Sequence, residues 1–285
     1  TLSSALKKTY PNLEIIVADN CSTDNTEDFV NRISDPRIRY FRQNKNIRAN
    51  DNFNFCLEHA KGDYFLLLHD DDLIDEDFVE VCMEAADYKT EIGIIRTGMR
   101  RIDAYGQVIG ESTNLAKGLS TTDFFLAWFS GKTPMHLCCN LFNKKRLSEI
   151  GGFKSKRELF QDVIAEVQLA ARFDRVDVKD IKASFRMHPT QTTGSVKVRD
   201  WCEDSLELLD IMCKLVQEKK LLVKNQGIRF FVNHNYNIAC RITSPLNRLI
   251  AYLMIYKMFD YQYFPIRRLL RRNIGRPISL IAGQK

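Results

Sequence analysis

Short apolar runs alternate with segments of helical periodicity over residues 1–195 of the chain. The apolar runs are rich in β-branched residues and have the length of buried strands. This alternation, with short loops, predicts an α/β fold built on a doubly wound, mostly parallel sheet. Strands are expected over residues 13–18, 38–41, 64–68, 91–99, 137–142 and 176–186, and helices over 3–8, 25–33, 49–60, 76–88, 121–129, 144–150 and 159–173.

The run YFLLLHDDDL, residues 64–73, passes from five apolar or aromatic residues into three consecutive carboxylates, Asp70, Asp71 and Asp72. A buried strand does not tolerate unpaired charges, so the acids are expected where the strand leaves the sheet, the edge at which α/β proteins bind ligands. Adjacent carboxylates repel one another, and a cation relieves that repulsion. Oxygen ligands suit Mg²⁺ or Mn²⁺, ions that commonly accompany substrate phosphates. A solvated acidic turn is the alternative that this run alone leaves open.

After residue 200 the pattern changes to long helical segments, interrupted by Pro245, Pro265 and Pro277. We therefore expect a first domain over residues 1–195 and a helical C-terminal extension over residues 196–285. The extension is expected to be basic and helical. The chain has no internal repeat and no low-complexity segment.

The basic residues concentrate near the C-terminal end. Residues 241–285 hold nine Lys or Arg and one acid, a charge of +8 within a chain total of +6. Residues 246–276 combine arginines with apolar helical positions, as basic amphipathic helices at membrane surfaces do. This pattern favours peripheral contact with an anionic membrane; a helical appendage packed on the catalytic domain or a dimer contact remains open.

Composition places the chain among globular proteins with a sizeable core, since 45% of its residues are hydrophobic. Its eight cysteines include no C-x-x-C pair and no zinc-ligand spacing, which fits small core residues in a reducing cytosol. No uninterrupted apolar stretch approaches the length of a membrane span. We therefore expect a cytoplasmic location, with any membrane contact made peripherally at the inner face of the cell membrane.

Several segments together resemble family 2 glycosyltransferases of the GT-A fold. In order, they are TYPNLEIIVADNCSTDNT, DPRIRYFRQNKN, NDNFNFCLEHAKGDYFLLLHDDDLI, IGGF at 150–153, FQD at 160–162, and FRMHP at 185–189 followed by Thr192 and Thr193. Any one of these matches is weak, but their common order over residues 5–195 is specific. The family's opening strand does not appear before residue 13, so we expect the chain to lack it.

The resemblance implies transfer of a sugar from a nucleotide-diphosphate sugar to a hydroxyl acceptor, with inversion and with Mg²⁺ or Mn²⁺. A UDP-sugar is the favoured donor and a saccharide or lipid-linked acceptor is expected, in surface polysaccharide or glycolipid assembly. Asp71, Asp72 and His188 are the implied metal ligands, and Asp70 faces the ribose. For His188, a structural role is the alternative.

The other implied roles belong to the nucleotide and the acceptor. Asp19 and Asn20 would meet the nucleotide, although Asn20 stands where the family commonly has Asp; for Asp19, capping of the following loop is the alternative. Arg48 stands where Gly is common and either reaches phosphate or is solvated. Asp162 is the expected base, because in-line attack needs a carboxylate opposite the leaving group, although a plain N-terminal helix acid is the alternative. Gln161 replaces the Glu that usually precedes this Asp.

Two other function classes share single features with this sequence. A sugar-phosphate nucleotidyltransferase is also doubly wound and metal-dependent, but its glycine-rich phosphate loop is not visible. A basic nucleic-acid-binding protein would use the C-terminal region, yet the aromatic residues lack an RNA-binding signature, and no nucleic-acid partner is expected. The residues around Trp201 lack the Q-x-x-R-W element of processive synthases, which favours transfer of single sugars.

Overall fold

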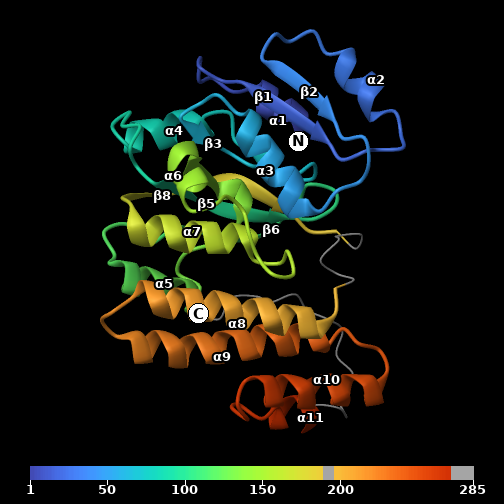
Figure 1. Cartoon of the computed structure of the whole chain (residues 1–285), viewed down its shortest axis with the longest axis vertical. Coiled ribbons are helices and arrows are strands. Elements are labelled where there is room, and N and C mark those ends of the chain that lie inside the picture. The colour runs from blue at the N-terminus through green and yellow to red at the C-terminus, as the bar shows by residue number, and fades with distance from the viewer. Residues whose placement is uncertain (189–195, 271–285) are drawn as a thin grey trace.

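The computed structural model describes residues 1–188 and 196–270 of the chain. Two sheets with their helices form one end and the middle of the molecule, and the C-terminal helices are stacked at the other end (Figure 1). The fold thus separates an α/β part from a helical part, and the first contains every site residue that the sequence predicts.

The smaller sheet pairs two parallel strands, β1 (Ile15–Asp19) and β2 (Ile38–Arg42). Their register runs from Ile15 opposite Ile38 to Asp19 opposite Arg42. The helices around this sheet are α1 (Leu2–Leu6), α2 (Thr26–Asn31) and α3 (Ala49–His59). Because both strands end on the same side, the loop that follows Asp19 lies at the carboxyl edge, where ligands of α/β proteins bind.

The larger sheet has the strand order β3-β7-β5-β8-β4, with β6 paired to β5. Its strands are β3 (Tyr64–Phe65), β4 (Leu73–Ile74), β5 (Ile94–Ile102), β6 (Val108–Ser112), β7 (Asn140–Asn143) and β8 (Arg175–Arg186). Only β5·β8 is parallel here, and the other four pairings among the described residues are antiparallel. The α/β character is as expected, but the strand directions are more mixed than in the expected mostly parallel sheet. One cause is β6, a strand missing from the sequence prediction, which folds back on β5 through a turn at Gly106 with φ +87°.

The run before the acids is not the parallel strand that its composition suggests. Only Tyr64 and Phe65 form a ladder, and they pair antiparallel with β7. Leu67 packs into one hydrophobic cluster, whereas Leu66 and Leu68 pack against the other. Both faces of the run are therefore covered, which explains its apolar composition, although the residues after Phe65 form no strand ladder. The acids still follow the point where this run leaves the core.

The remaining helices of the α/β part agree with the predicted ones to within a few residues. They are α4 (Phe78–Ala85), α5 (Thr121–Phe129), α6 (Lys144–Glu149) and α7 (Gln161–Arg172), with a 3₁₀ turn at Leu137–Cys139. That turn shortens the strand expected over 137–142. Helix α7 carries Asp162 in its first turn.

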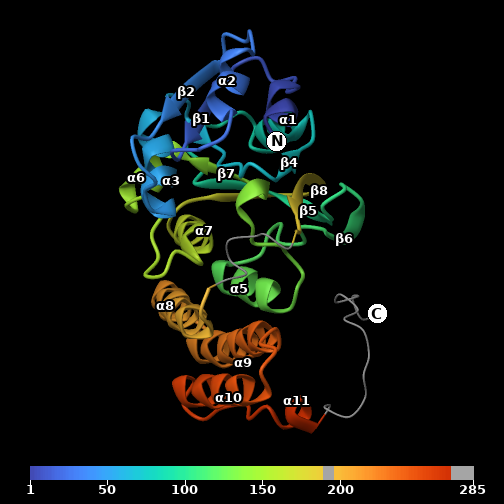
Figure 2. The same ribbon diagram turned by 90° about the vertical axis from the view of Figure 1, so that its right-hand side faces the viewer.

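The C-terminal helices pack onto the α/β part through a shared core. They are α8 (Val198–Leu215), α9 (Lys220–Ala239), α10 (Pro245–Met258) and the short α11 (Ile266–Leu270). A single hydrophobic cluster includes Phe142 of the sheet, Leu208 of α8 and Phe231 of α9. Turning the molecule shows α5 beside α9 and α10 at the far end of the stack (Figure 2). No helix within 1–188 or 196–270 is both long and apolar enough to cross a membrane.

Close packing of α8 and α9 depends on Gly227. A Cβ atom placed there would lie 2.4 Å from Cδ1 of Leu209, which is closer than real contacts allow. The predicted boundary at residue 195, together with Thr192 and Thr193, falls outside the described residues. A division into residues 1–195 and 196–285 therefore stays a proposal, and the shared core indicates that the two parts stabilise each other.

Candidate active site

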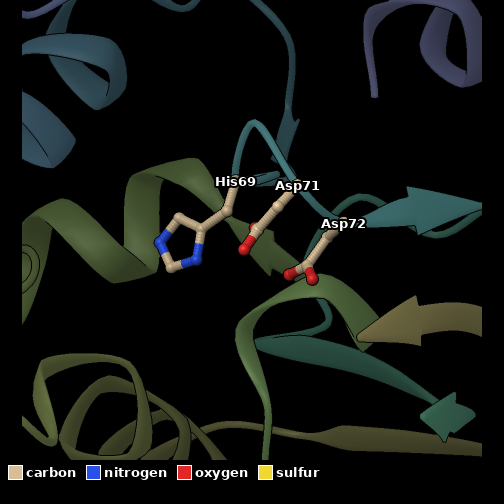
Figure 3. A group of neighbouring side chains, drawn as sticks. All are labelled: His69, Asp71 and Asp72. Atoms are coloured by element: carbon tan, nitrogen blue, oxygen red, sulfur yellow. The ribbon is translucent and has the colours of Figure 1, made fainter. Parts of the chain in front are cut away.

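The loop that follows residues 64–68 brings together His69, Asp71 and Asp72. Each offers one ligand atom, and these three atoms lie within 4.8 Å of one another. Figure 3 shows the three side chains leaving the same loop and pointing to the same side of it. Asp70 is exposed and is not a member of this group. Asp70 is therefore the one acid of the three that does not belong to the candidate metal group.

Asp72 is the buried acid of this group. Burial raises the pKa of its carboxyl to about 6, and the charge of Asp71 acts in the same direction, whereas the backbone N–H of Arg186 and the charge of His69 oppose them. That N–H donates to Oδ1 of Asp72 at 3.0 Å. A cation beside the carboxyl would favour its ionised form, because it compensates for the lost solvation.

The end of β8 holds the acid loop from the opposite side. Nε2 of His188 lies 2.8 Å from Oδ2 of Asp71, and Nε of Arg186 donates to the backbone oxygen of Asp71 at 2.9 Å. The structure thus brings His188 next to one of its two predicted metal-binding partners. These contacts join positions more than 110 residues apart in the chain.

The residues present fit a divalent cation. Two carboxylates and one imidazole with ligand atoms within 4.8 Å of one another suit Mn²⁺, and the carboxylates suit Mg²⁺. His188 either joins this set or orients Asp71 through their contact. His69 was absent from the ligands predicted from the sequence. Its position directly before the three acids was the available signal.

Asp162 lies in the first turn of α7. Burial raises the pKa of Asp162, and the backbone N–H of Val163 and the charge of His69 oppose that rise. The charge of His69 acts on the Asp162 carboxyl, which indicates that the acid loop and the start of α7 lie near one another. A raised pKa makes a carboxylate a stronger base, as a proton acceptor in catalysis requires.

A buried ion network fixes the helix that carries Asp162. One turn further along α7, Oε1 of Glu166 lies 2.5 Å from Nε of Arg96 on β5. Nη1 of the same arginine lies 2.9 Å from Oδ1 of Asp177 on β8. Nδ2 of Asn140 donates to the other Glu166 oxygen at 3.1 Å. Because the charges are paired and buried, removing one partner would leave the others uncompensated, so the network holds α7 rigidly against the sheet.

Asp19 and Asn20 shape the edge of the small sheet. Oδ1 of Asp19 accepts from the backbone N–H of Ser22 at 2.7 Å, and Oδ2 accepts from the Tyr40 hydroxyl at 2.6 Å. Oδ1 of Asn20 accepts from the N–H of Ile47 at 2.9 Å, while its Nδ2 donates to the oxygen of Ile47 at 2.8 Å. Asp19 therefore makes the loop-capping contact that was the alternative to nucleotide binding. Both side chains position the loops in which a nucleotide would lie.

Arg48 is paired with an acid of the loop before α7. Its Nε lies 2.9 Å from Oε1 of Glu158, although most of its side chain is exposed. A second link is made by Asn54 of α3, whose amide donates to the oxygen of Phe153 at 3.0 Å and accepts from its N–H at 2.8 Å. Helix α3 thus connects the edge of β1 to the segment that leads to Asp162. Phe53 of the same helix also contacts His69, with ring centroids 5.5 Å apart.

Solved structures define the class of this fold. The chain resembles S. aureus TarS 1–349 in complex with UDP, with a TM-score of 0.55 and 13% identity over 99% of this chain and 90% of that one. It also resembles the mannosyltransferase PcManGT from Pyrobaculum calidifontis, in complex with GDP-Man and Mn²⁺, with a TM-score of 0.57 and 16% identity over 95% of this chain and 73% of that one. The fold is therefore the GT-A type of glycosyltransferases, as the sequence predicted.

The sequence then identifies the family. The family model described as glycosyl transferase family 2 matches residues 1–151, more than half of the chain. The chain belongs to glycosyl transferase family 2. Its predicted class, a glycosyltransferase, is thereby confirmed.

Curated relatives include enzymes of polysaccharide and glycolipid synthesis. One is the UDP-Glc:alpha-D-GlcNAc-diphosphoundecaprenol beta-1,3-glucosyltransferase WfaP of Escherichia coli, 44% identical over 72 residues, which are 25% of this chain and 29% of WfaP. Another is the GalNAc(5)-diNAcBac-PP-undecaprenol beta-1,3-glucosyltransferase of Campylobacter jejuni, 30% identical over 156 residues, 52% of this chain and 49% of that enzyme. Chondroitin synthase of Pasteurella multocida is 25% identical over 76% of this chain. The chain spans about a quarter to a half of the length of these relatives.

Proposed function

We propose that this protein transfers a sugar, with inversion, from a nucleotide-diphosphate sugar to a hydroxyl of a saccharide or lipid-linked acceptor, with the help of Mg²⁺ or Mn²⁺. The observation that carries the proposal is the group His69, Asp71 and Asp72, supported by the effect of the His69 charge on the pKa of Asp162. In this proposal the cation-binding group and the base act in one site. Surface polysaccharide or glycolipid assembly is the proposed setting, because two relatives are named for undecaprenol-linked acceptors and a third is a chondroitin synthase.

Each part of the site has a proposed task in that reaction. Asp71, Asp72 and His69 would hold the cation, with His188 as a further ligand or as the group that orients Asp71. When bound, the cation supplies neutralisation of the diphosphate as it leaves. Asp162 accepts the proton of the attacking hydroxyl. Attack from the side opposite the leaving group inverts the configuration at the anomeric carbon.

The donor is proposed to be a UDP-sugar held at the edge of the small sheet. Asp19 and Asn20 line this edge and keep its loops in place, and Asp70, outside the cation-binding group, stays the candidate for the ribose. Arg48 would reach phosphate only by leaving Glu158, which is feasible for an exposed ion pair worth at most about 1 kcal/mol. TarS was solved with UDP and WfaP is named for UDP-Glc, which supports a UDP-sugar.

A panel of nucleotide diphosphates tests this proposal directly. We expect UDP with Mn²⁺ to raise the melting temperature, and neither UDP nor Mn²⁺ alone to do so to the same extent, because each completes the binding site of the other. Differential scanning fluorimetry with UDP, GDP, ADP and RNA provides the comparison. If no nucleotide diphosphate stabilises the protein and RNA does, the protein is not a nucleotide-sugar transferase.

Peripheral contact with an anionic membrane is the second part of the proposal. Helix α10 exposes an apolar stripe at helical spacing: Leu246, Leu249, Ile250 and Leu253. Beside this stripe, Arg248 and Arg268 line a cavity of about 230 Å³ between α10 and α11, together with Tyr252. An apolar stripe next to two guanidinium groups matches a lipid surface with anionic headgroups. The predicted range 246–276 extends past residue 270 and so lies partly outside the described residues.

We expect the protein to bind vesicles containing phosphatidylglycerol and to be released as ionic strength rises, because salt screens the arginines. Replacing Leu246 and Ile250 by Ser should weaken this binding by roughly tenfold or more, since two apolar side chains no longer enter the lipid. Leu221→Ser is the matched control, since Leu221 is 71% exposed but lies on α9. Vesicle co-sedimentation measures all three proteins. Equal binding by the double variant and the control, or salt-insensitive binding, would contradict membrane contact through α10.

A further inference from the structure

An open cavity of about 580 Å³ lies along one face of α9 and does not belong to the site described above. Its lining includes Phe129 at the end of α5 and, on α9, Gln226, Arg229, Phe230, Asn233 and Asn237. The α9 residues recur at intervals of three and four, so they form one stripe along the helix. We call this cavity the α9 groove.

The apolar wall of the α9 groove is aromatic. The rings of Phe129 and Phe230 have centroids 5.2 Å apart, and Trp128 packs on Phe230 at 4.8 Å. Aromatic faces are rigid and lose little conformational entropy when a ligand packs on them. The C–H faces of a pyranose ring are ligands of suitable shape and polarity for such a wall.

The polar wall of the α9 groove carries side-chain amides. Gln226, Asn233 and Asn237 each present an acceptor oxygen and a donor NH₂, and their side chains reach solvent. Sugar hydroxyls both donate and accept, and an acetamido group pairs with an amide in the same way. Within residues 1–188 and 196–270 no acid lines the groove, which disfavours a cation there. A few placed polar groups on an aromatic floor are typical of sites for small ligands.

His234, which also lines the groove, has an unsatisfied ring nitrogen. Its Nε2 is buried and has no hydrogen-bond partner in the structure, a rare condition for a buried polar atom. Burial, assisted by the charge of Arg241, lowers the pKa of His234 to about 4, so its ring is neutral at pH 7. Nε1 of Trp201, whose ring lies 5.2 Å from that of His234, is also buried without a partner.

Packed aromatic rings connect the α9 groove to the start of the helix that carries the proposed base. The ring of Phe160 lies 5.9 Å from that of His234 and 5.5 Å from that of Trp201. Phe160 is the N-cap residue of α7, two positions before Asp162. The rings of His234, Trp201 and Phe160 therefore connect the wall of the groove to the N-terminal end of α7, where the proposed base lies.

We infer that the α9 groove binds an N-acetylhexosamine-containing saccharide, as a subsite for the part of the acceptor beyond the sugar that reacts. The inference rests on the proposed glycosyl transfer, and it names the chemistry of the acceptor. Two relatives are named for acceptors that contain GlcNAc or GalNAc, which supports this choice of sugar. Bound saccharide would pack on Phe129 and Phe230, pair with the amides, and lie against the ring of His234.

Both tryptophans of the chain lie next to the α9 groove, so intrinsic fluorescence reports on it without a label. We expect titration with N-acetylchitotetraose or a chondroitin tetrasaccharide, without donor, to change the emission in a saturable way. The double variant Asn233→Ala/Asn237→Ala should weaken binding by roughly tenfold, because two amide groups that pair with the saccharide are lost. It should raise the KM for a lipid-linked acceptor of the same sugars to a similar extent. Asn225→Ala, exposed on the same helix and outside the lining, is the matched control.

Two results would overturn the inference. One is the absence of a saturable change with both saccharides while UDP with Mn²⁺ still stabilises the protein; the proposed function then stands and the groove has another role. The other is equal weakening in the double variant and in Asn225→Ala, which would place the binding elsewhere. A saccharide response that persists when UDP with Mn²⁺ has no effect would instead overturn the proposed function and keep the groove as a saccharide site.

Discussion

Replacing Asp162 by Asn is expected to lower the rate of sugar transfer by about 10²- to 10⁴-fold, the usual contribution of a general base. The amide keeps the shape of the carboxylate but cannot accept the acceptor proton. Because Asp162 belongs to α7 and not to the loop of His69, Asp71 and Asp72, affinity for UDP with Mn²⁺ should stay near that of the wild type. Loss of transfer with retained donor binding is the expected combination.

Transfer from a UDP-sugar and the Mn²⁺-dependent stabilisation by UDP are the two measurements for this variant. Asp51→Asn is the matched control, because Asp51 is also an acid in the first turn of a helix, here α3, and is exposed. It should behave as the wild type in both measurements. Turnover retained by Asp162→Asn would reject this carboxylate as the base and leave it as an ordinary acid at a helix N-terminus.

Replacing Asp71 by Asn should remove most of the Mn²⁺ dependence of UDP binding and reduce transfer by at least about 100-fold. Asp71 contributes a ligand atom to the candidate metal group, and its carboxylate also contacts His188 at 2.8 Å. Neutralising it removes one anionic ligand and the partner that orients the imidazole, and metal-assisted charge stabilisation is commonly worth several kcal/mol.

Asp70→Asn is the informative comparison, since Asp70 is its neighbour in sequence but is outside the metal group. We expect Asp70→Asn to weaken UDP at every Mn²⁺ concentration, as loss of a ribose contact would. Isothermal titration of UDP at several Mn²⁺ concentrations distinguishes the two patterns, with circular dichroism to verify folding. The reverse result, with Mn²⁺ dependence lost only in Asp70→Asn, would exchange the roles of the two residues.

Most residues of the acid loop site could be predicted from the sequence. The transition from apolar residues to three carboxylates predicted an oxygen-rich site at an edge of the fold, and the structure places His69, Asp71 and Asp72 together there. The sequence pointed to His188 as well, because it stands in a segment that resembles the family. It missed His69, whose single imidazole in a loop carries no periodic signal.

For residues 64–68, before the acids, amino-acid composition led to a wrong prediction of strand direction. An apolar stretch covered on both faces was interpreted as a parallel strand, yet only Tyr64 and Phe65 pair, and they pair antiparallel. Composition reports burial, whereas strand direction depends on which partner the chain meets. The same limit explains the absence of β6 from the prediction, since its residues are largely exposed and lack an apolar face.

By itself, the sequence determined most of the helices and strands in their order, the acid loop, the helix acid Asp162 and the family, because each is encoded in local periodicity or in motifs a few residues long. The tertiary structure alone decided which acids converge, how Arg186 and His188 hold the acid loop, and how α9 meets Phe129 to form a groove. The contacts of Arg186 and His188 with Asp71 join positions 115 and 117 residues apart. The groove joins Phe129 to Gln226 and later residues of α9. The spacing of residues along the sequence does not predict these long-range contacts, because they depend on how whole helices and strands pack against a common core.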